Sequence, residues 1–176
     1  MGCASALTLH ARGANVTLLE RAIPGAEASS AAGGSLGAQI ESHNASDVEM
    51  LSLFVKARSL FSSWADELRE RCGIDVGHRV CGVMKLAHTE NDQQVNSQIA
   101  EVQRGRGLRA EILSKAEALS LEPTLGDSFG EALYFADDAQ VDPPQLLRSP
   151  AVALLHLEDL LDDRRGRLMR RVVRPR

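Results

Sequence analysis

Apolar residues near the start of the chain follow a helical spacing first and a strand-like run afterwards. We expect a helix over Gly2–Arg12 that ends at Gly13, because glycine commonly terminates helices. Its apolar side is formed by Ala4, Leu7 and Leu9. The next apolar run, Val16–Leu19, is short and rich in β-favouring residues, which is typical of a buried strand in a parallel sheet.

An acidic residue, Glu20, follows this run at its carboxyl end. Helix, strand and terminal acid are typical of the second half of a dinucleotide-binding βαβ unit, in which the acid binds an adenosine ribose and the helix N-terminus binds pyrophosphate. Gly2 stands where the third glycine of the G-x-G-x-x-G fingerprint is expected, and we find no counterpart of the first strand and first two glycines. Glu20 is therefore our candidate ribose ligand, with Arg21 facing the adenosine. The alternatives are a solvated acid and a surface arginine.

A loop of small residues follows this segment. It consists of Ser29, Ser30, Ala31, Ala32, Gly33 and Gly34. Small side chains let backbone N–H groups approach phosphate oxygens, and serine hydroxyls donate hydrogen bonds to them. We interpret the loop as a cofactor-binding segment; the alternative is a flexible connection made of alanine, glycine and serine.

Beyond the loop, helical and strand-like patterns alternate, which indicates a mixed α/β chain. We expect Asp47 to cap one long helix over Val48–Cys72. Its apolar face is formed by Leu51, Phe54, Phe61, Trp64 and Leu68. Such a stripe is typical of core packing, so we expect Trp64 to be largely buried.

The remaining elements are shorter. We expect strands over Arg79–His88, Leu108–Leu113 and Glu131–Ala136, and a helix over Asn91–Arg104. A capping box formed by Ser114 and Glu117 predicts a short helix that ends at Pro123, and Asp142 is expected to cap a helix that begins at Pro143.

Composition limits the classes of protein. Apolar residues make up 44% of 176, enough for a folded core, and no run is long enough to span a bilayer. The three cysteines, Cys3, Cys72 and Cys81, lack C-x-x-C spacing, and the histidines lack metal-ligand spacing. We therefore expect a cytoplasmic protein without a metal site.

Charge is distributed unevenly. The net charge is −4, yet the last thirteen residues contain seven arginines. We expect residues 149–176 to be a divergent, poorly ordered tail, because so few apolar side chains cannot offset the entropy of ordering. An interaction through this basic tail is an alternative function. Nucleic acid is a disfavoured partner, because no aromatic residues are interleaved with the arginines.

Four segments resemble the FAD-dependent D-amino acid oxidase superfamily, and within it the glycine oxidases. They are GCASALTLHARGANVTLLER, ASSAAGGSLGAQ, CGVMKLAHTE and LEPTLGDSFGEALYFADDAQVDP, in the order and spacing of that family. The resemblance implies an α/β fold with a truncated Rossmann-like FAD-binding domain and part of a second α+β substrate domain. It assigns residues 1–72 and 137–148 to the first domain and residues 73–136 to the second.

The resemblance also implies a function: FAD-dependent oxidation of a small amine or amino acid, with dioxygen as the second substrate. It places Ser29–Gly34 along the pyrophosphate and flavin, and Ser35 beside the flavin face. The residues that bind the substrate carboxylate in this family have no counterpart here, so the catalytic residues are unknown. An alternative is a non-catalytic remnant of such an enzyme. We expect the isolated chain neither to hold FAD tightly nor to oxidise amines.

Overall fold

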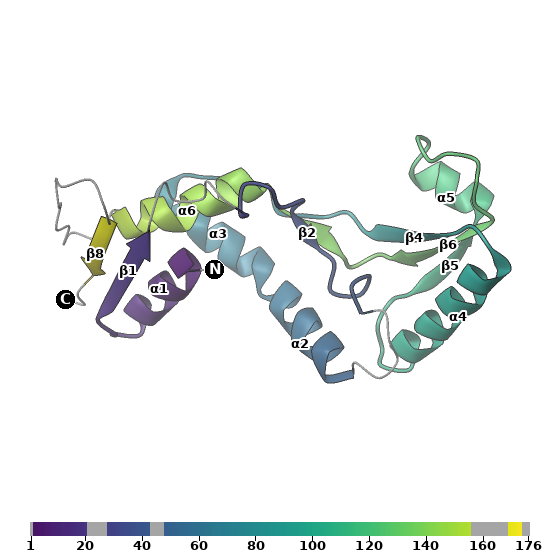
Figure 1. The fold of residues 1–176 in the computed structure, drawn as a ribbon, viewed down its shortest axis with the longest axis horizontal. Coiled ribbons are helices and arrows are strands. Elements are labelled where there is room, and N and C mark those ends of the chain that lie inside the picture. Colours follow the sequence, from purple (N-terminus) through teal and green to yellow (C-terminus); the bar gives the residue numbers. More distant parts are fainter. Residues whose placement is uncertain (1, 21–27, 43–47, 156–168, 174–176) are drawn as a thin grey trace. The chain divides into compact units, whose positions relative to one another are not determined.

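The computed structural model describes residues 2–20, 28–42, 48–155 and 169–173 (Figure 1). The chain forms two compact units. Unit 1 contains residues 1–34, 62–78 and 141–176, and unit 2 contains residues 35–61 and 79–140. Residues 35–61 thus belong to the same unit as residues 79–140, and the domain bounds expected from the sequence stay a prediction. Which unit serves the cofactor and which the substrate stays a prediction.

Unit 1 is built from three helices and two strands in the described part of the chain. They are α1 (Gly2–Ala11), β1 (Val16–Glu20), α3 (Phe61–Cys72), α6 (Pro143–Leu155) and β8 (Met169–Val173). Its core joins Ala6 and Leu7 of α1 to Leu68 of α3, and Leu18 of β1 packs against this cluster. The predicted helix and strand at the start of the chain are therefore confirmed, and α1 packs on β1. The predicted apolar side of the helix is only partly correct, because Leu7 is buried together with Ala6, whereas Leu9 is exposed.

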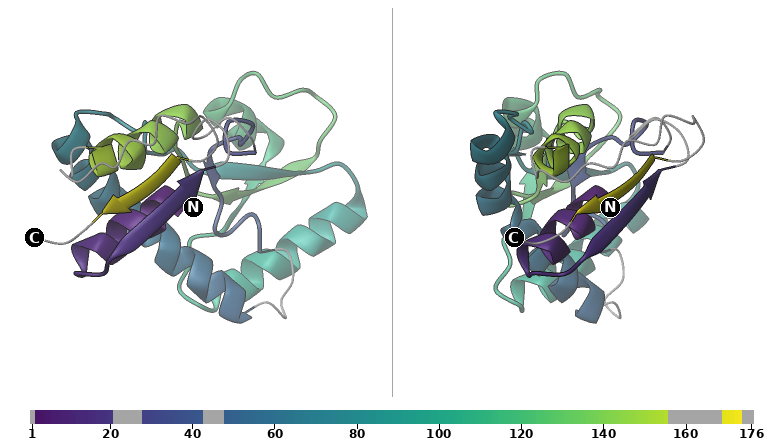
Figure 2. Two further views of the ribbon diagram at one scale, coloured as in Figure 1. Left: turned by 60° about the vertical axis from the view of Figure 1, so that its left-hand side comes forward. Right: turned by 90° about the vertical axis from the view of Figure 1, so that its left-hand side faces the viewer.

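The second strand of this unit corrects a prediction. Residues Met169–Val173 lie in the segment that we expected to be poorly ordered, but they form β8 and pair antiparallel with β1 (Figure 2). Val16 lies opposite Val173, and Glu20 lies opposite Met169. The physical reason is that Val172 and Val173 favour strands, and the backbone groups along an edge of β1 accept a pairing partner.

Unit 2 contains two small antiparallel sheets. One has the order β2-β7-β3 and the other β4-β6-β5. The strands are β2 (Ser35–Leu36), β3 (Arg79–Val80), β4 (Val83–Ala87), β5 (Glu111–Ser114), β6 (Glu131–Phe135) and β7 (Ala139–Gln140), and the helices are α2 (Val48–Ser59), α4 (Glu90–Arg104) and α5 (Lys115–Leu121).

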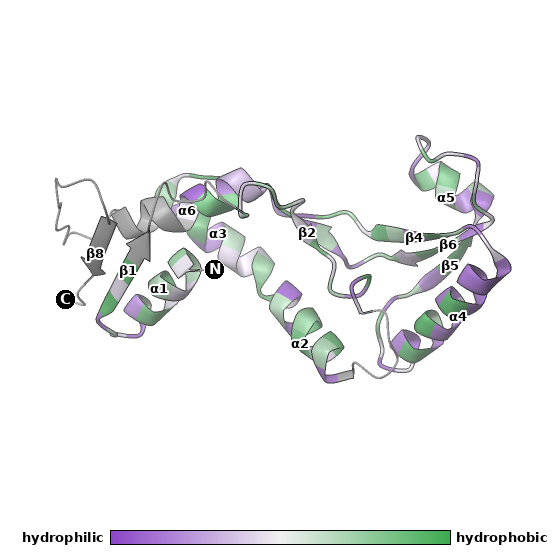
Figure 3. Cartoon of the chain, viewed as in Figure 1, coloured by the Kyte–Doolittle hydropathy of each residue, from purple (hydrophilic) through white to green (hydrophobic). Residues whose placement is uncertain are grey.

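The helices α4 and α5 cover opposite faces of the sheet β4-β6-β5 (Figure 1), and side chains of β6 contact both of them. Leu133 and Phe135 point to a cluster that includes Ile99 of α4, while Ala132 points to a cluster that includes Ala118 of α5. This alternation is the two-residue period of a strand. Figure 3 shows hydrophilic and hydrophobic residues interspersed along α4, and the buried residues of this helix are Asn96, Ile99, Ala100 and Gln103.

The predicted helix caps are confirmed where the structure describes them. The Ser114 hydroxyl accepts from the Glu117 amide, and the Glu117 carboxylate accepts from the Ser114 amide at 2.8 Å. At α6, the Asp142 carboxylate accepts from the Gln145 amide at 3.1 Å. The expected cap at Asp47 lies outside the described residues.

Two predicted elements are each divided in the structure. The long helix breaks at Leu60 into α2 and α3, because the Leu60 amide bonds to Ala57 three residues back and the Ser59 hydroxyl bonds to the Lys56 carbonyl. The strand expected over Arg79–His88 breaks at Gly82, whose φ of +70° no other residue adopts easily.

Trp64 also differs from its prediction, since it is partly rather than largely buried. It packs at the margin of the core cluster of unit 1, while Leu68, one turn along α3, is fully buried. Because a large ring seldom fits entirely within the core of a small unit, Trp64 stays partly exposed to solvent.

Among the described helices, none combines the length and apolar character that crossing a membrane requires.

Candidate functional site

The helix start proposed to face a pyrophosphate is built by close packing of α1 on β1. Gly2 is the first residue of α1, and a Cβ atom placed on it would lie 3.3 Å from Leu18 Cδ1 of β1. That spacing is tighter than ordinary side-chain contact, so a larger residue would require the Leu18 side chain to shift by a few tenths of an ångström. The role matches that of the third fingerprint glycine, which permits close helix–strand packing.

Glu20 ends β1, as the sequence predicted. Its backbone pairs with Met169, so the structure fixes its position at the carboxyl end of the strand. Its side chain is not described, and Arg21 lies outside the described residues. The ribose-binding role of Glu20 and the adenosine-facing role of Arg21 therefore stay predictions.

The loop of small residues begins with a turn in which the Ala31 amide donates to the Ala28 carbonyl at 3.2 Å. Ser29 is partly buried, whereas Ser30, Ala31, Ala32 and Gly33 are exposed. A Cβ atom on Gly33 would meet no heavy atom within 4 Å. Packing within the chain therefore does not require these side chains to be small. This is the result expected if the residues are small because a ligand lies against them.

Gly34 differs from the rest of the loop because the fold itself requires it. Its φ is +80°, and a Cβ atom there would overlap the Val141 carbonyl oxygen and lie 3.1 Å from Pro143 Cδ. The Val141 amide in turn donates to the Gly34 carbonyl at 2.9 Å. Gly34 thus joins the loop to the start of α6 inside unit 1, and its small size serves this contact.

These observations fit a cofactor with a pyrophosphate group. The start of α1 and the exposed residues up to Gly33 offer backbone N–H groups without bulky side chains, as phosphate binding requires. Among the described residues, no group of acidic, histidine or cysteine side chains is arranged to hold a metal ion.

Unit 2 contains a pocket that the sequence did not predict. Its volume is about 440 Å³, and it lies between the segment after β2 and one side of α2. It is lined by Leu36, Gly37, Ala38, Glu41, Phe54, Ala57, Arg58 and Phe61. Mostly apolar walls with a few polar groups are typical of small-molecule sites.

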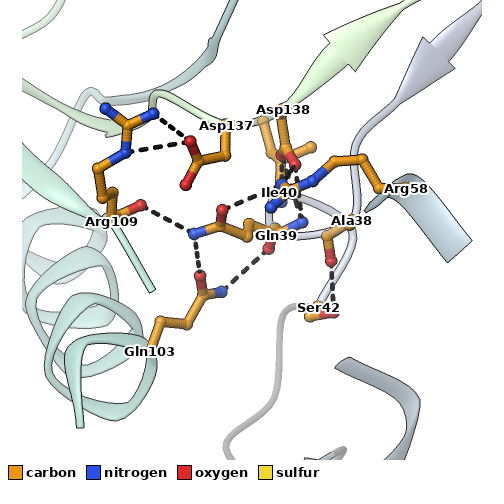
Figure 4. A network of polar contacts seen from close by, with 9 residues as sticks. All are labelled: Ala38, Gln39, Ile40, Ser42, Arg58, Gln103, Arg109, Asp137 and Asp138. Carbon is orange, nitrogen blue, oxygen red and sulfur yellow. Dashed lines mark hydrogen bonds and ion pairs between the residues drawn. The ribbon is translucent and has the colours of Figure 1, made fainter. Parts of the chain in front are cut away.

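Beside this pocket, a buried polar network centres on Asp138, which follows β6 (Figure 4). Its carboxylate accepts from the backbone amides of Gln39 at 3.1 Å and Ile40 at 3.0 Å, and from the guanidinium of Arg58. Arg58 Nη1 also donates to Gln39 Oε1 at 3.0 Å. Segments that are distant in the sequence therefore meet at one carboxylate.

Gln39 extends the network toward α4. Its Nε2 donates to Gln103 Oε1 at 2.9 Å and to the Arg109 carbonyl at 2.8 Å, and Gln103 Nε2 returns a bond to the Gln39 carbonyl at 3.0 Å. Both glutamine side chains are buried with these partners satisfied. The sequence analysis did not predict this network. Two features could have indicated it: Gln39 at the end of SLGAQ, and the adjacent acids Asp137 and Asp138 in ADDAQVDP.

The neighbouring acid, Asp137, lies on the surface instead. It pairs with Arg109, whose side chain is 61% exposed. The hydrogen bond from Arg109 holds the pKa of Asp137 below its ordinary value, and the same bond raises the pKa of Arg109. Two consecutive carboxylates thus have different surroundings, because Asp138 is buried and Asp137 is partly exposed.

Comparison with known proteins gives a consistent result. The profile of the family described as "FAD dependent oxidoreductase" (DAO) matches residues 1–158. The glycine oxidase of Geobacillus kaustophilus is 38% identical over 154 residues, which are 87% of this chain and 40% of that protein. The chain therefore spans less than half the length of this relative.

Solved structures agree. The crystal structure of the Geobacillus kaustophilus glycine oxidase superposes with a TM-score of 0.70 at 39% identity, over 76% of this chain and 36% of that one. The glycine oxidase of Bacillus cereus superposes with a TM-score of 0.77 over 98% of this chain and 50% of that one, at 24% identity, which speaks for the fold alone. The resemblance and the fold class predicted from the sequence are both confirmed.

Proposed function

This chain belongs to the FAD-dependent oxidoreductase (DAO) family, and on that premise we propose that it supplies the cofactor-binding part of an oxidase of the glycine oxidase type. The substrate class is a small amine or amino acid, and dioxygen is the second substrate. When bound, FAD supplies the redox chemistry by accepting a hydride from the carbon next to the amine. The residues of this chain bind and orient the cofactor.

One observation carries the proposal: Gly2 at the first turn of α1 packs closely on Leu18 of β1, and a Cβ atom on Gly2 would lie 3.3 Å from Leu18 Cδ1. This packing brings the first turn of α1 beside Leu18, near the carboxyl end of β1. A helix N-terminus carries a partial positive charge and unpaired N–H groups, so it attracts the pyrophosphate of a dinucleotide. The family's cofactor, FAD, contains that group.

We assign the remaining residues by their positions. Glu20, at the end of β1, accepts hydrogen bonds from the adenosine ribose, and Arg21 lies on the adenosine side. The segment Ser29–Gly33 follows the pyrophosphate toward the flavin, where serine hydroxyls and backbone amides donate to phosphate oxygens. Gly34 holds the end of this segment against Val141.

We further propose that the isolated 176-residue chain binds FAD weakly and does not catalyse oxidation. It spans 40% of the length of the Geobacillus kaustophilus glycine oxidase, so it offers part of a cofactor site. A partial site forms fewer contacts while binding still costs the ligand its translational and rotational freedom. A Kd above about 100 µM, near −5.5 kcal/mol, is the expected range.

The test is a purification in the presence of FAD, followed by removal of free cofactor and a visible spectrum. We expect no retained flavin band and no peroxide with glycine or other small amines. A parallel titration with FAD then compares the wild type with Glu20→Ala and with Glu101→Ala, an exposed acid on α4 that serves as the control. Weaker binding in Glu20→Ala alone supports the proposal, whereas equal binding in all three proteins contradicts it.

A basic tail that binds other macromolecules remains the second prediction from the sequence. Two of its arginines, Arg170 and Arg171, lie in β8, where their backbone pairs with β1. No described contact favours an interaction function over the oxidase proposal.

A further inference from the structure

The segment that follows the small-residue loop has few backbone contacts of its own in the described structure. Its strand β2 is only two residues long, and its turn is closed by bonds such as that from the Glu41 amide to the Gly37 carbonyl at 3.0 Å. The amides of Gln39 and Ile40, at the centre of this turn, both donate to the Asp138 carboxylate. A buried amide without an acceptor is costly, so the turn depends on this side chain.

The Asp138 carboxylate is surrounded by hydrogen-bond donors. It is fully buried, and Arg58 of α2 provides the positive charge that a buried carboxylate requires. The Oδ1 atom accepts from Arg58 and Gln39, and the Oδ2 atom accepts from Ile40 and, at 3.3 Å, from Gln39. An uncharged amide in place of the carboxylate would turn an N–H group toward one of these donors.

The same ion pair borders the pocket of unit 2. Arg58 lines the pocket together with Leu36, Gly37 and Ala38, the residues just before the bonded turn. Displacing the turn would therefore move one wall of the pocket. A Cβ atom on Gly37 would lie 2.6 Å from Ile40 Cγ2, so this part of the turn is tightly packed as well.

We propose that Asp138 is a positioning residue that, with Arg58, clamps the segment Ser35–Ile40 in the conformation that faces the flavin. This inference rests on the proposed function, because the resemblance places Ser35 beside the flavin face. Asp138 acts through the two backbone amides and does not itself touch the cofactor. Within unit 2, the clamp fixes the pocket wall formed by Leu36, Gly37 and Ala38.

The experiment measures amide hydrogen exchange in the full chain. Asp138→Asn should accelerate exchange in peptides that cover residues 35–42 by about 10- to 100-fold, because one buried charge-assisted acceptor is lost. Asp137→Asn, which changes the adjacent surface carboxylate in the same way, should leave those peptides unchanged. Unchanged exchange in Asp138→Asn would overturn the proposal.

A second variant covers the case in which Asp138→Asn does not fold. Replacing both members of the pair, Arg58→Met with Asp138→Leu, removes the buried charges together and is tolerated in other buried ion pairs. This double variant should keep its circular dichroism spectrum and still show fast exchange in residues 35–42. Slow exchange there would show that packing alone holds the segment, which contradicts the clamp.

A flavin readout separates positioning from simple stability. At millimolar FAD we expect the wild type and Asp137→Asn to shift the visible flavin spectrum equally, and Asp138→Asn to give no shift while its circular dichroism is unchanged. An equal shift in Asp138→Asn would contradict the positioning role. Absence of any shift in the wild type would contradict the proposed function, and the exchange data would then decide the clamp by themselves.

Discussion

The guanidinium of Arg58 and the carboxylate of Asp138 form an ion pair inside unit 2, with side chains that are 11% and 0% exposed. The two residues are eighty positions apart and belong to α2 and to the turn between β6 and β7. Their contact joins a helix, a sheet and the segment after β2 through a single carboxylate (Figure 4). The stability of unit 2 and the shape of its pocket should therefore depend on both charges.

Removing one of these charges should be costly. Arg58→Met leaves a buried carboxylate without its partner, and breaking such a pair typically costs about 3–5 kcal/mol. Urea unfolding of the purified chain measures the loss. Arg109→Met is the matched control, because its pair with Asp137 lies on the surface, where such pairs contribute about 0–1 kcal/mol. Equal losses in the free energy of unfolding in the two variants would mean that the buried pair stabilises the chain no more than the surface pair does.

Two adjacent glycines should respond differently to the same substitution. Gly34→Ala introduces a side chain at a φ of +80° that overlaps the Val141 carbonyl, so we expect a loss of about 2 kcal/mol or more in the free energy of unfolding. Gly33→Ala meets open space and should change stability by about 0.5 kcal/mol or less. Thermal unfolding of both variants provides the measurement, and a larger loss in Gly33→Ala would contradict this assignment.

The capping box at the start of α5 predicts both a stability change and a pH dependence. Ser114→Ala should destabilise the chain by about 1 kcal/mol, a usual cost for a lost N-cap. The hydrogen bonds from Ser114 hold the pKa of Glu117 below its ordinary value of 4.5. Because the folded pKa is depressed, this contribution is present above pH 4.5 and is lost as the pH falls through the folded value.

A carboxyl titration followed by NMR checks this sign. In Ser114→Ala the pKa of Glu117 should rise toward its ordinary value. The pKa of Asp92, which is lowered by Thr89 in the separate capping box of α4, should stay unchanged and serves as the internal control. A Glu117 pKa that does not move in the variant would show that Ser114 is not its cause.

Much of the fold could be predicted because it is encoded locally. The helix at Gly2–Ala11, the strand that ends at Glu20 and the box between Ser114 and Glu117 all follow from spacing within a few residues. The break at Leu60 was missed because no proline or glycine marks it. It arises from side-chain and three-residue backbone bonds, which periodicity does not reveal.

The parts of the fold and of the candidate site that the sequence did not predict depend on contacts between residues that are distant in the chain. The pairing of β1 with β8 joins two ends of the chain, and the bond between the Gln39 amide and Asp138 spans 99 positions. An arginine-rich segment or an Asp-Asp pair is commonly solvated, so the sequence alone does not reveal that these residues are paired or buried. The candidate cofactor residues were found through the local sequence pattern and the resemblance, whereas the pocket and its polar network needed the structure.

The central claim is that this chain contributes the adenosine and pyrophosphate side of a FAD site. Saturation-transfer difference NMR on the wild-type chain tests it directly, because the method detects weak ligands and resolves which of their protons lie against the protein. We predict strong transfer to the adenine and ribose protons of FAD, loss of that transfer in Glu20→Ala, and clearly weaker transfer to FMN, which lacks the adenosine group. Equal transfer to FMN, or none to FAD, would contradict the claim.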